Sequence, residues 1–342
     1  MGSIFNARQL VHPSHYEPGL IITQSQASGY MDTLAGGGLR TQISSIDKVV
    51  YANRLDVRTQ IAANQATANV LPGATLTGDF IQTATYMYRQ RNEYNEWDVA
   101  EAGEYNVSLP MAYRYAQRQG AFQFIRNAGL YGVNAANSEG LLNTPGATTV
   151  NLPPDSFGNA TLPTYDAGQL AIWFQGVILA LLSRMFLLGT PVRIVILGPQ
   201  RVLGQMQLQN VVQLTSFQRP GAGAATTAQE ITTINKEFGY SVEWAFDDTL
   251  RDQGGSSTTD AVLVVAPELN IPEVPGINTN EFAKVAPNIS GNTLQYSDVI
   301  APVEVTTPIP EGLDVTSSIR TSAGWCIRPQ AITICQIPMG VA

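Results

Sequence analysis

The chain of 342 residues is long enough to bury a large hydrophobic core, and its length allows one to three domains. Charged residues make up only 13% of it, about half the usual fraction, and the formal net charge of −8 argues against a general nucleic-acid-binding surface. A surface poor in charge but rich in Gln, Asn, Thr and Ala suits a protein covered by neighbouring subunits, and it fits a weakly charged soluble protein equally well.

Residues 1–54 predict an extended arm, because they carry many Gly, Ser and Gln side chains and show weak hydrophobic periodicity. The triplet Gly36–Gly38 is a flexible break and not a phosphate loop, since no strand precedes it and no Lys-Ser/Thr pair follows. A disordered tail is the alternative. Residues 1–30 lack a basic start followed by an apolar run, so we expect no secretory signal.

Residues 55–90 predict a long β-hairpin, with Pro72-Gly73 as its turn signal. Arms of about 15 residues would reach about 50 Å. Neither face of the alternating pattern in residues 76–89 is cleanly apolar, and a lone two-stranded ribbon is only marginally stable in water. We therefore expect the ribbon to lean on a neighbouring subunit, with an ordinary internal hairpin as the alternative.

Residues 93–104 predict an acidic helix with five carboxylates, whose inner side would hold Tyr94, Trp97 and either Ala100 or Glu101. The helix that follows has the opposite charge, since residues 105–138 contain no acidic side chain. Two adjacent helices of opposite charge can pair side by side, within one subunit or between two, although such surface pairs are individually weak. A solvated acidic face is an equally good interpretation.

The second helix is bounded by capping residues. Ser108 can satisfy a free backbone N–H at its start, Pro110 suits the first turn, and Gly129 is the predicted C-cap. Its basic residues are Arg114, Arg118 and Arg126.

From residue 151 the pattern becomes α/β, after a Pro- and Asn-rich boundary at residues 151–164. The predicted helices are 166–188, 199–208 and 227–238, the predicted strands are 192–197, 240–246 and 261–266, and the surface loops are 219–226 and 251–260. The most apolar run, residues 170–182, is shorter than the about 20 residues that a bilayer requires, so we expect a protein made in the cytoplasm. Residues 270–292 are irregular, and 299–307 and 317–337 predict the last strands.

No arrangement of residues predicts catalysis. Both histidines, His12 and His15, lie in the predicted arm, and the Gly-rich run 221–225 is not fed by a strand, as a dinucleotide site would require. The pair Asp247-Asp248 follows a strand, where aspartate caps the backbone more often than it binds a metal. Two cysteines, Cys326 and Cys335, form no disulfide framework. We expect no catalytic residue, no cofactor and no metal.

Two stretches carry a resemblance to a known family. The first is the helix at 108–129 followed by Gly-Leu-Leu-Asn-Thr-Pro-Gly at 140–146, and the second is Trp-Cys-Ile-Arg-Pro-Gln-Ala-Ile at 325–332, which would form a strand. Together they resemble one branch of the major capsid proteins of tailed bacteriophages, which have the Hong Kong 97-like fold shared with encapsulin shells.

The resemblance implies an α+β fold with defined parts. These are an N-terminal arm (1–54), an extended E-loop hairpin (55–90), a discontinuous P-domain with a long spine helix (91–150 and 293–342), and an α/β A-domain (151–292) whose loops gather around a hexamer or pentamer axis. The last strands would complete the sheet of the P-domain.

The implied function is structural and non-catalytic: copies of the chain would form the icosahedral head of a tailed double-stranded DNA bacteriophage. The implied partners are other copies in hexamers and pentamers, a portal, a separate scaffold protein and a cement or decoration protein, with the virion as the final location and no membrane. Candidate contacts between subunits are Arg58, Phe80, Tyr86, Tyr88, Arg89, Arg114 and Arg118. Because residues 55–90 contain no lysine, the isopeptide crosslink of some relatives is not expected.

Two alternatives remain open. An encapsulin-like compartment with protein cargo would use the same fold. An α/β enzyme or binding protein built on residues 166–266 belongs to another class, and it lacks the polar side chains that chemistry requires.

Overall fold

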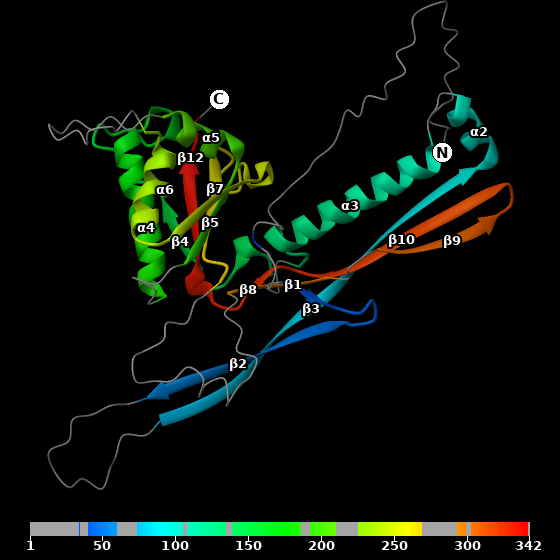
Figure 1. Ribbon diagram of the computed structural model, residues 1–342, viewed down its shortest axis with the longest axis horizontal. Coiled ribbons are helices and arrows are strands. Elements are labelled where there is room, and N and C mark those ends of the chain that lie inside the picture. Colours follow the sequence, from blue (N-terminus) through cyan, green and yellow to red (C-terminus); the bar gives the residue numbers. More distant parts are fainter. Residues whose placement is uncertain are drawn as a thin grey trace, which may run out of the picture.

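A single long strand, β3 (Ala74–Asn95), joins two parts of the first sheet. The computed structural model describes residues 34, 40–59, 74–104, 108–134, 139–185, 192–209, 225–268, 293–298 and 302–340. These residues form two lobes: an elongated lobe built on a seven-stranded sheet and one long helix, and an α/β lobe with a five-stranded sheet (Figure 1). The predicted α+β class is confirmed.

The β3 strand changes partner halfway along its length. From Ala74 to Ala84 it pairs with β2 (Val49–Thr59), and from Thr85 to Asn95 it pairs with β10 (Gly312–Ser322), antiparallel in both cases. The predicted hairpin is therefore present, but its strands extend beyond residues 55–90 at both ends, and its predicted turn at 72–73 lies outside the described residues.

The rest of the first sheet comes from both ends of the chain. The strand order is β1-β8-β10-β3-β2, with β9 paired to β10 and β11 paired to β8. The bounds are β1 (Arg40–Gln42), β8 (Leu294–Asp298), β9 (Val303–Ile309) and β11 (Trp325–Cys326). The expected return of the C-terminal part to the first half of the chain is thus found in β8 to β11.

Two helices follow β3. Helix α2 (Glu96–Glu104) begins later than predicted, because residues 93–95 pair with β10 and the Asn95 side chain accepts a hydrogen bond from the Asp98 N–H (2.7 Å). Helix α3 (Leu109–Tyr131) lies along β3 and β10 (Figure 1). Ser108 is its N-cap, but the Ser108 hydroxyl makes no capping bond.

The predicted end of α3 at Gly129 is wrong by three residues, since the C-cap is Gly132 with φ 74°. At Gly129 the helix instead approaches the chain at Gly324, where a β-carbon would lie 2.4 Å from the Gly129 carbonyl oxygen. Glycine is needed there for close approach, and at Gly132 for a positive φ.

The second lobe has strand order β4-β12-β7-β5-β6. The strands are β4 (Thr148–Asn151), β12 (Ile332–Pro338), β7 (Thr259–Val265), β5 (Arg193–Gly198) and β6 (Ser241–Phe246), and the helices are α4 (Ala167–Arg184), α5 (Gln200–Leu208) and α6 (Thr227–Glu237). Two expectations are corrected here. Strand β12 belongs to this sheet and not to the first, and the Arg328-Pro329 stretch enters a short 3-10 turn (Pro329–Ala331) instead of continuing a strand.

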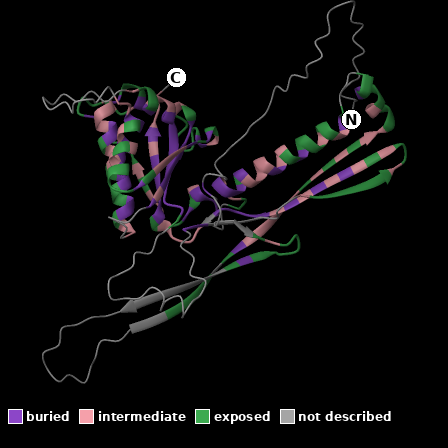
Figure 2. Ribbon diagram, in the orientation of Figure 1, coloured by how far each residue is buried: buried purple, intermediate pink, exposed green. Residues whose placement is uncertain are grey.

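The five-stranded sheet is covered on both faces, so β7 is buried along its whole length and β5 is buried at every residue after Arg193 (Figure 2). Alternate side chains of one strand enter different clusters: Val262 and Val264 face the cluster formed with α4, α5 and α6, whereas Leu263 and Val265 face a cluster containing Leu130 of α3. The end of the long helix is therefore part of the core of the second lobe.

Helix α4 is long and apolar enough to cross a membrane by length and composition alone (18 residues, mean hydropathy 1.3). Its N-cap, Asp166, accepts a hydrogen bond from the Gln169 N–H (2.8 Å). In the structure Leu170, Phe174 and Ile178 are fully buried in the first of the two clusters. We therefore identify α4 as the core helix of this lobe.

Candidate functional site

The β2–β3 ribbon presents an aromatic pair to solvent. The rings of Tyr51 and Phe80 meet edge to face with centroids 5.9 Å apart, and the two residues are 60% and 59% exposed. They are diagonal neighbours in the register, in which Asn53 lies opposite Phe80. Arg58 of β2 lies opposite Thr75 of β3, and the Arg58 side chain is outside the described residues. Exposed apolar pairs on a thin ribbon are typical of contact surfaces.

Two other predicted contact residues are used inside the chain. The Tyr88 ring stacks on Phe124 of α3 with centroids 5.2 Å apart, and the Tyr86 hydroxyl donates to Glu139 Oε1 (2.7 Å). Both therefore hold α3 and the segment after it against the sheet. Arg89 is exposed, with its Nε 3.0 Å from Met87 Sδ.

The two predicted arginines of α3 lie one turn apart. Arg114 is 55% exposed, and its Nε is 3.7 Å from Glu304 Oε2 on β9. Arg118 is exposed and has no ion pair with any described residue. All seven candidates, including Arg58, Tyr86 and Tyr88, stay predicted contacts between subunits.

The Gly140–Gly146 motif closes the C-terminal end of α3. The Asn143 side-chain amide donates to the Tyr131 carbonyl (2.8 Å), and the Gly140 N–H donates to the Gly324 carbonyl (2.8 Å). Gly140 has φ 87°, and a β-carbon there would lie 2.4 Å from the Gly132 nitrogen. The motif thus satisfies carbonyls that a helix end leaves free, and only glycine fits at its first position.

The same motif joins the two lobes. Leu141 is buried beside Leu130, Leu263 and Val265 in the cluster on the second face of the five-stranded sheet. The Tyr131 hydroxyl also donates to the Thr249 carbonyl of the second lobe, and burial raises the pKa of Tyr131. Burial of a leucine contributes roughly 1.5–3 kcal/mol, so α3 and the second lobe are held together by packing.

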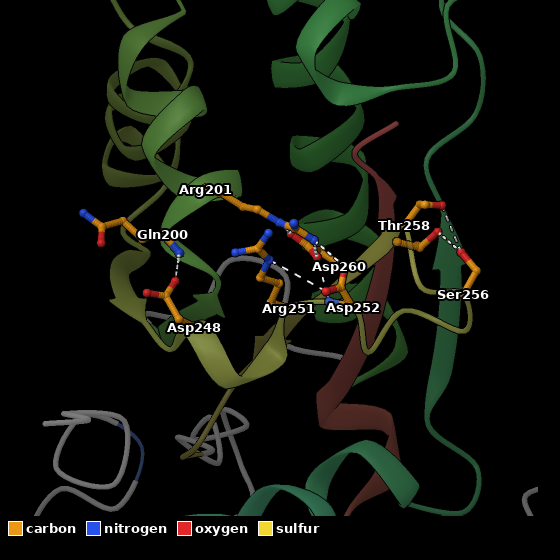
Figure 3. A network of polar contacts seen from close by, with 9 residues as sticks. Gln200, Arg201, Asp248, Arg251, Asp252, Ser256, Thr258 and Asp260 are labelled. Atoms are coloured by element: carbon orange, nitrogen blue, oxygen red, sulfur yellow. Dashed lines mark hydrogen bonds and ion pairs between the residues drawn. The ribbon is translucent and has the colours of Figure 1, made fainter. Parts of the chain in front are cut away.

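One buried ion pair fixes a loop of the second lobe (Figure 3). The Arg201 guanidinium bonds Asp260 through Nε (2.6 Å) and Asp252 through Nη2 (2.7 Å), and the Asp260 side chain is 0% exposed. The hydrogen bond to Asp260 raises the pKa of Arg201. The Asp252 N–H donates back to Asp260 (2.9 Å), which holds Asp252 at φ 58°. The network orders the loop between Arg251 and Thr258.

The remaining acidic and sulfur groups have structural roles. Asp247 accepts from the Thr249 N–H (3.0 Å), and Asp248 accepts from the Gln200 N–H (2.8 Å) at the start of α5, which confirms the predicted capping. Burial raises the pKa of Cys326 and of Cys335 to about 12 each, so both are neutral thiols. Among the described residues, no group of three or more His, Cys, Asp and Glu side chains could hold a metal ion.

Sequence reasoning missed three residues of these surfaces. The sequence prediction places Tyr51 in the arm, although the alternation of Val49, Tyr51 and Asn53 continues the ribbon strand and is a usable signal. Trp97 was placed on the inner side of its helix, but it is 74% exposed, and Ala102 is the buried residue of α2. No local signal identifies Glu139, because its partner Tyr86 is 53 residues away.

No family model matches the chain, and no curated protein matches it in sequence. Solved structures match it in fold along nearly the whole length. The capsid of Myoviridae phage XM1 superposes with a TM-score of 0.69 at 15% identity, covering 98% of this chain and 100% of that one. The capsid of a native GTA particle gives 0.57 at 11% identity (99% and 99%), and Mycobacterium phage Ogopogo gives 0.55 at 12% (95% and 97%). The predicted Hong Kong 97-like fold is confirmed.

Proposed function

We propose that this chain is the major capsid protein of a tailed double-stranded DNA bacteriophage, whose copies assemble into the icosahedral head shell. The observation that carries the proposal is the match to the capsid of phage XM1 over 98% of this chain and 100% of that one, because a shared single domain would not align the ribbon, the long helix and the α/β lobe together. The role is mechanical, and the virion is its location.

The ribbon supports this proposal independently. Among the described strands, the Ala74–Ala84 half of β3 pairs with β2 and with no other, so the ribbon has two strands there and carries an exposed aromatic pair at Tyr51 and Phe80. Two strands alone are marginally stable in water, so an outside surface must cover them. In a shell of identical chains that surface is a neighbouring copy.

We assign the parts of the chain accordingly. The β2–β3 ribbon is the E-loop, α3 is the spine helix of the P-domain, and residues 151–292 form most of the A-domain, with β4 and β12 contributed from the flanking segments. Assembly proceeds through hexamers and pentamers in the host cytoplasm with a portal, a separate scaffold protein and, on the finished head, a decoration protein. The shell encloses DNA without reading its sequence.

An encapsulin-like shell around protein cargo is the second candidate. The fold permits it, but the solved structures described above belong to phage and GTA particles, which favours the capsid.

The test is electron microscopy of the purified chain together with its mass by light scattering. Closed shells or sheets of hexamers are expected, with nucleic acid inside when the chain is expressed with its phage partners. A monomer or dimer that never assembles, even with scaffold and portal supplied, would overturn the proposal. Shells filled with a host protein would shift it to the compartment.

A further inference from the structure

The exposed side of α2 carries one compact acidic stripe around a tryptophan. Trp97, Glu101 and Glu104 are all exposed and follow one another at helical spacings of four and three residues, so they share one face. Trp97 is 74% exposed, although a large aromatic side chain is usually buried. We call these three residues the α2 stripe.

Helix α3 carries a matching stripe of opposite charge. Met111, Arg114, Tyr115 and Arg118 share one exposed face, with Met111 69% and Tyr115 51% exposed. The residues of α3 that pack inward are others, among them Gln117 and Ala121. We call these four residues the α3 stripe.

The charges of the two stripes do not neutralise each other within one chain. Arg114 faces Glu304 of β9, at 3.7 Å. No ion pair between described residues joins α2 to α3, and Arg118, Glu101 and Glu104 each lack a charged partner among them. The opposite charges of α2 and α3 are therefore not joined by an ion pair within the described part of the subunit.

The two stripes fit each other in length and chemistry. Trp97 to Glu104 covers seven helical steps, as does Met111 to Arg118, which is about 10 Å of helix in each case. With the helices side by side in the same direction, Trp97 lies against Met111 and Tyr115, Glu101 beside Arg114, and Glu104 beside Arg118. Tryptophan and arginine are the residues that most often dominate contact surfaces.

We propose that the α2 stripe of one copy docks on the α3 stripe of a second copy. The inference rests on the proposed function, since copies of the chain meet in a shell. Exposed ion pairs are individually weak, so the contact supplies orientation and charge matching more than strength, while Trp97 supplies the apolar anchor.

The test is a charge-reversal cycle on the full chain, read as the assembled fraction by sedimentation and light scattering, with circular dichroism to show folding. Glu104→Arg and Arg118→Glu should each lower the assembled fraction about tenfold at fixed concentration, and the double reversal should restore it. Trp97→Ala should lower it as well. Lys236→Glu on α6, which changes the net charge as Arg118→Glu does, is the matched control and should assemble normally.

The outcomes separate this inference from the proposed function. If the wild-type chain forms shells and each single charge reversal leaves the assembled fraction unchanged, the docking is overturned and the proposed function stands. The docking would also be overturned if Arg118→Glu lowered the assembled fraction, Glu104→Arg did not, and the double reversal failed to restore it. The α3 stripe would then bind DNA or a scaffold protein. A wild-type chain that never assembles would overturn both.

Discussion

Gly129 and Gly324 lie in backbone contact, although 195 positions separate them in the printed sequence. A β-carbon on Gly324 would lie 2.4 Å from the Gly129 oxygen, and a neighbouring bond, from the Gly324 N–H to the Ala128 carbonyl (3.2 Å), fixes the approach. The contact binds the end of α3 to the segment that leads from β10 into the second lobe.

Gly324→Ala should therefore destabilise the protein, because neither backbone can move without breaking a hydrogen bond. Overpacking of this kind costs typically 1–3 kcal/mol. The measurement is the urea midpoint at a constant m-value. Gly176→Ala on α4, where nothing lies within 4 Å of the added carbon, is the control and should be neutral or stabilising by up to about 1 kcal/mol. Equal midpoints for Gly324→Ala and wild type would contradict the packing argument.

Arg201→Ala should be the more damaging of two arginine substitutions in the second lobe. It leaves the Asp260 carboxylate buried without its cation, which costs roughly 3–5 kcal/mol. Arg193→Ala removes the bond to the partly exposed Glu243 (2.8 Å) and should cost less than about 1 kcal/mol. Chemical unfolding of both variants checks this ranking. If Arg201→Ala lowered the free energy of unfolding less than Arg193→Ala, Asp260 would have to be solvated.

The two thiols predict a loss of stability in alkali. Their pKa values are about 12 in the folded chain, above the ordinary 9.0, because burial disfavours the thiolate. As the pH rises past about 9 the unfolded state loses these protons first, so the free energy of unfolding should fall between pH 9 and 12. The decline should be smaller in a Cys326→Ala, Cys335→Ala variant.

The same burial predicts the reactivity of the thiols. At pH 8 a thiol reagent should leave the buried Cys335 unmodified in the native chain and should modify it after denaturation, because only an exposed thiolate reacts. The half-buried Cys326 should react slowly in the native chain, because its raised pKa keeps it a neutral thiol. Rapid labelling of Cys335 in the native protein would contradict its complete burial.

The aromatic pair on the ribbon should matter for assembly and not for folding. Tyr51→Ser with Phe80→Ser should leave circular dichroism and the unfolding midpoint nearly unchanged, since both rings are exposed, and should sharply lower the yield of shells in electron microscopy. Phe157→Ser, which removes an exposed ring from the second lobe, is the control. Normal shell yield from the double variant would remove the ribbon pair from the assembly surface.

The local sequence pattern predicts those helices and strands whose residues are buried in a regular way. Residues 261–266 are apolar throughout, and residues 192–197 are apolar except for Arg193, because their strands are covered on both faces. This pattern predicts strands at both places. Residues 227–238 were also predicted as a helix, and Thr226 and Gln229 form a capping box at its start. The Gly140–Gly146 motif carries part of the family resemblance, and in the structure its first glycine, Gly140, has a positive φ and a close backbone approach.

Pairing over long distances in the chain was not predictable in the same way. Strand β12 is flanked by β4 and β7, and nothing in residues 332–338 indicates which sheet they join. The end of α3 was misplaced because Gly129 looks like a C-cap but serves a contact with Gly324. Among the seven candidate contacts, Tyr86 and Tyr88 have partners inside the chain, which alternation along one strand cannot reveal.

The change of partner within β3 means that one continuous strand connects the ribbon to the sheet under α3. Twenty-two residues of continuous strand extend about 70 Å, and the pairing passes from β2 to β10 between Ala84 and Thr85. A load applied to the ribbon reaches the sheet under α3 along one unbroken backbone, and the ladder to β10 resists it in shear. We expect bending to concentrate between Ala84 and Thr85, where, among the described strands, β3 loses its partner on one edge and gains one on the other. A strand that is stiff on both sides of one flexible point can follow a surface whose curvature changes and still carry tension.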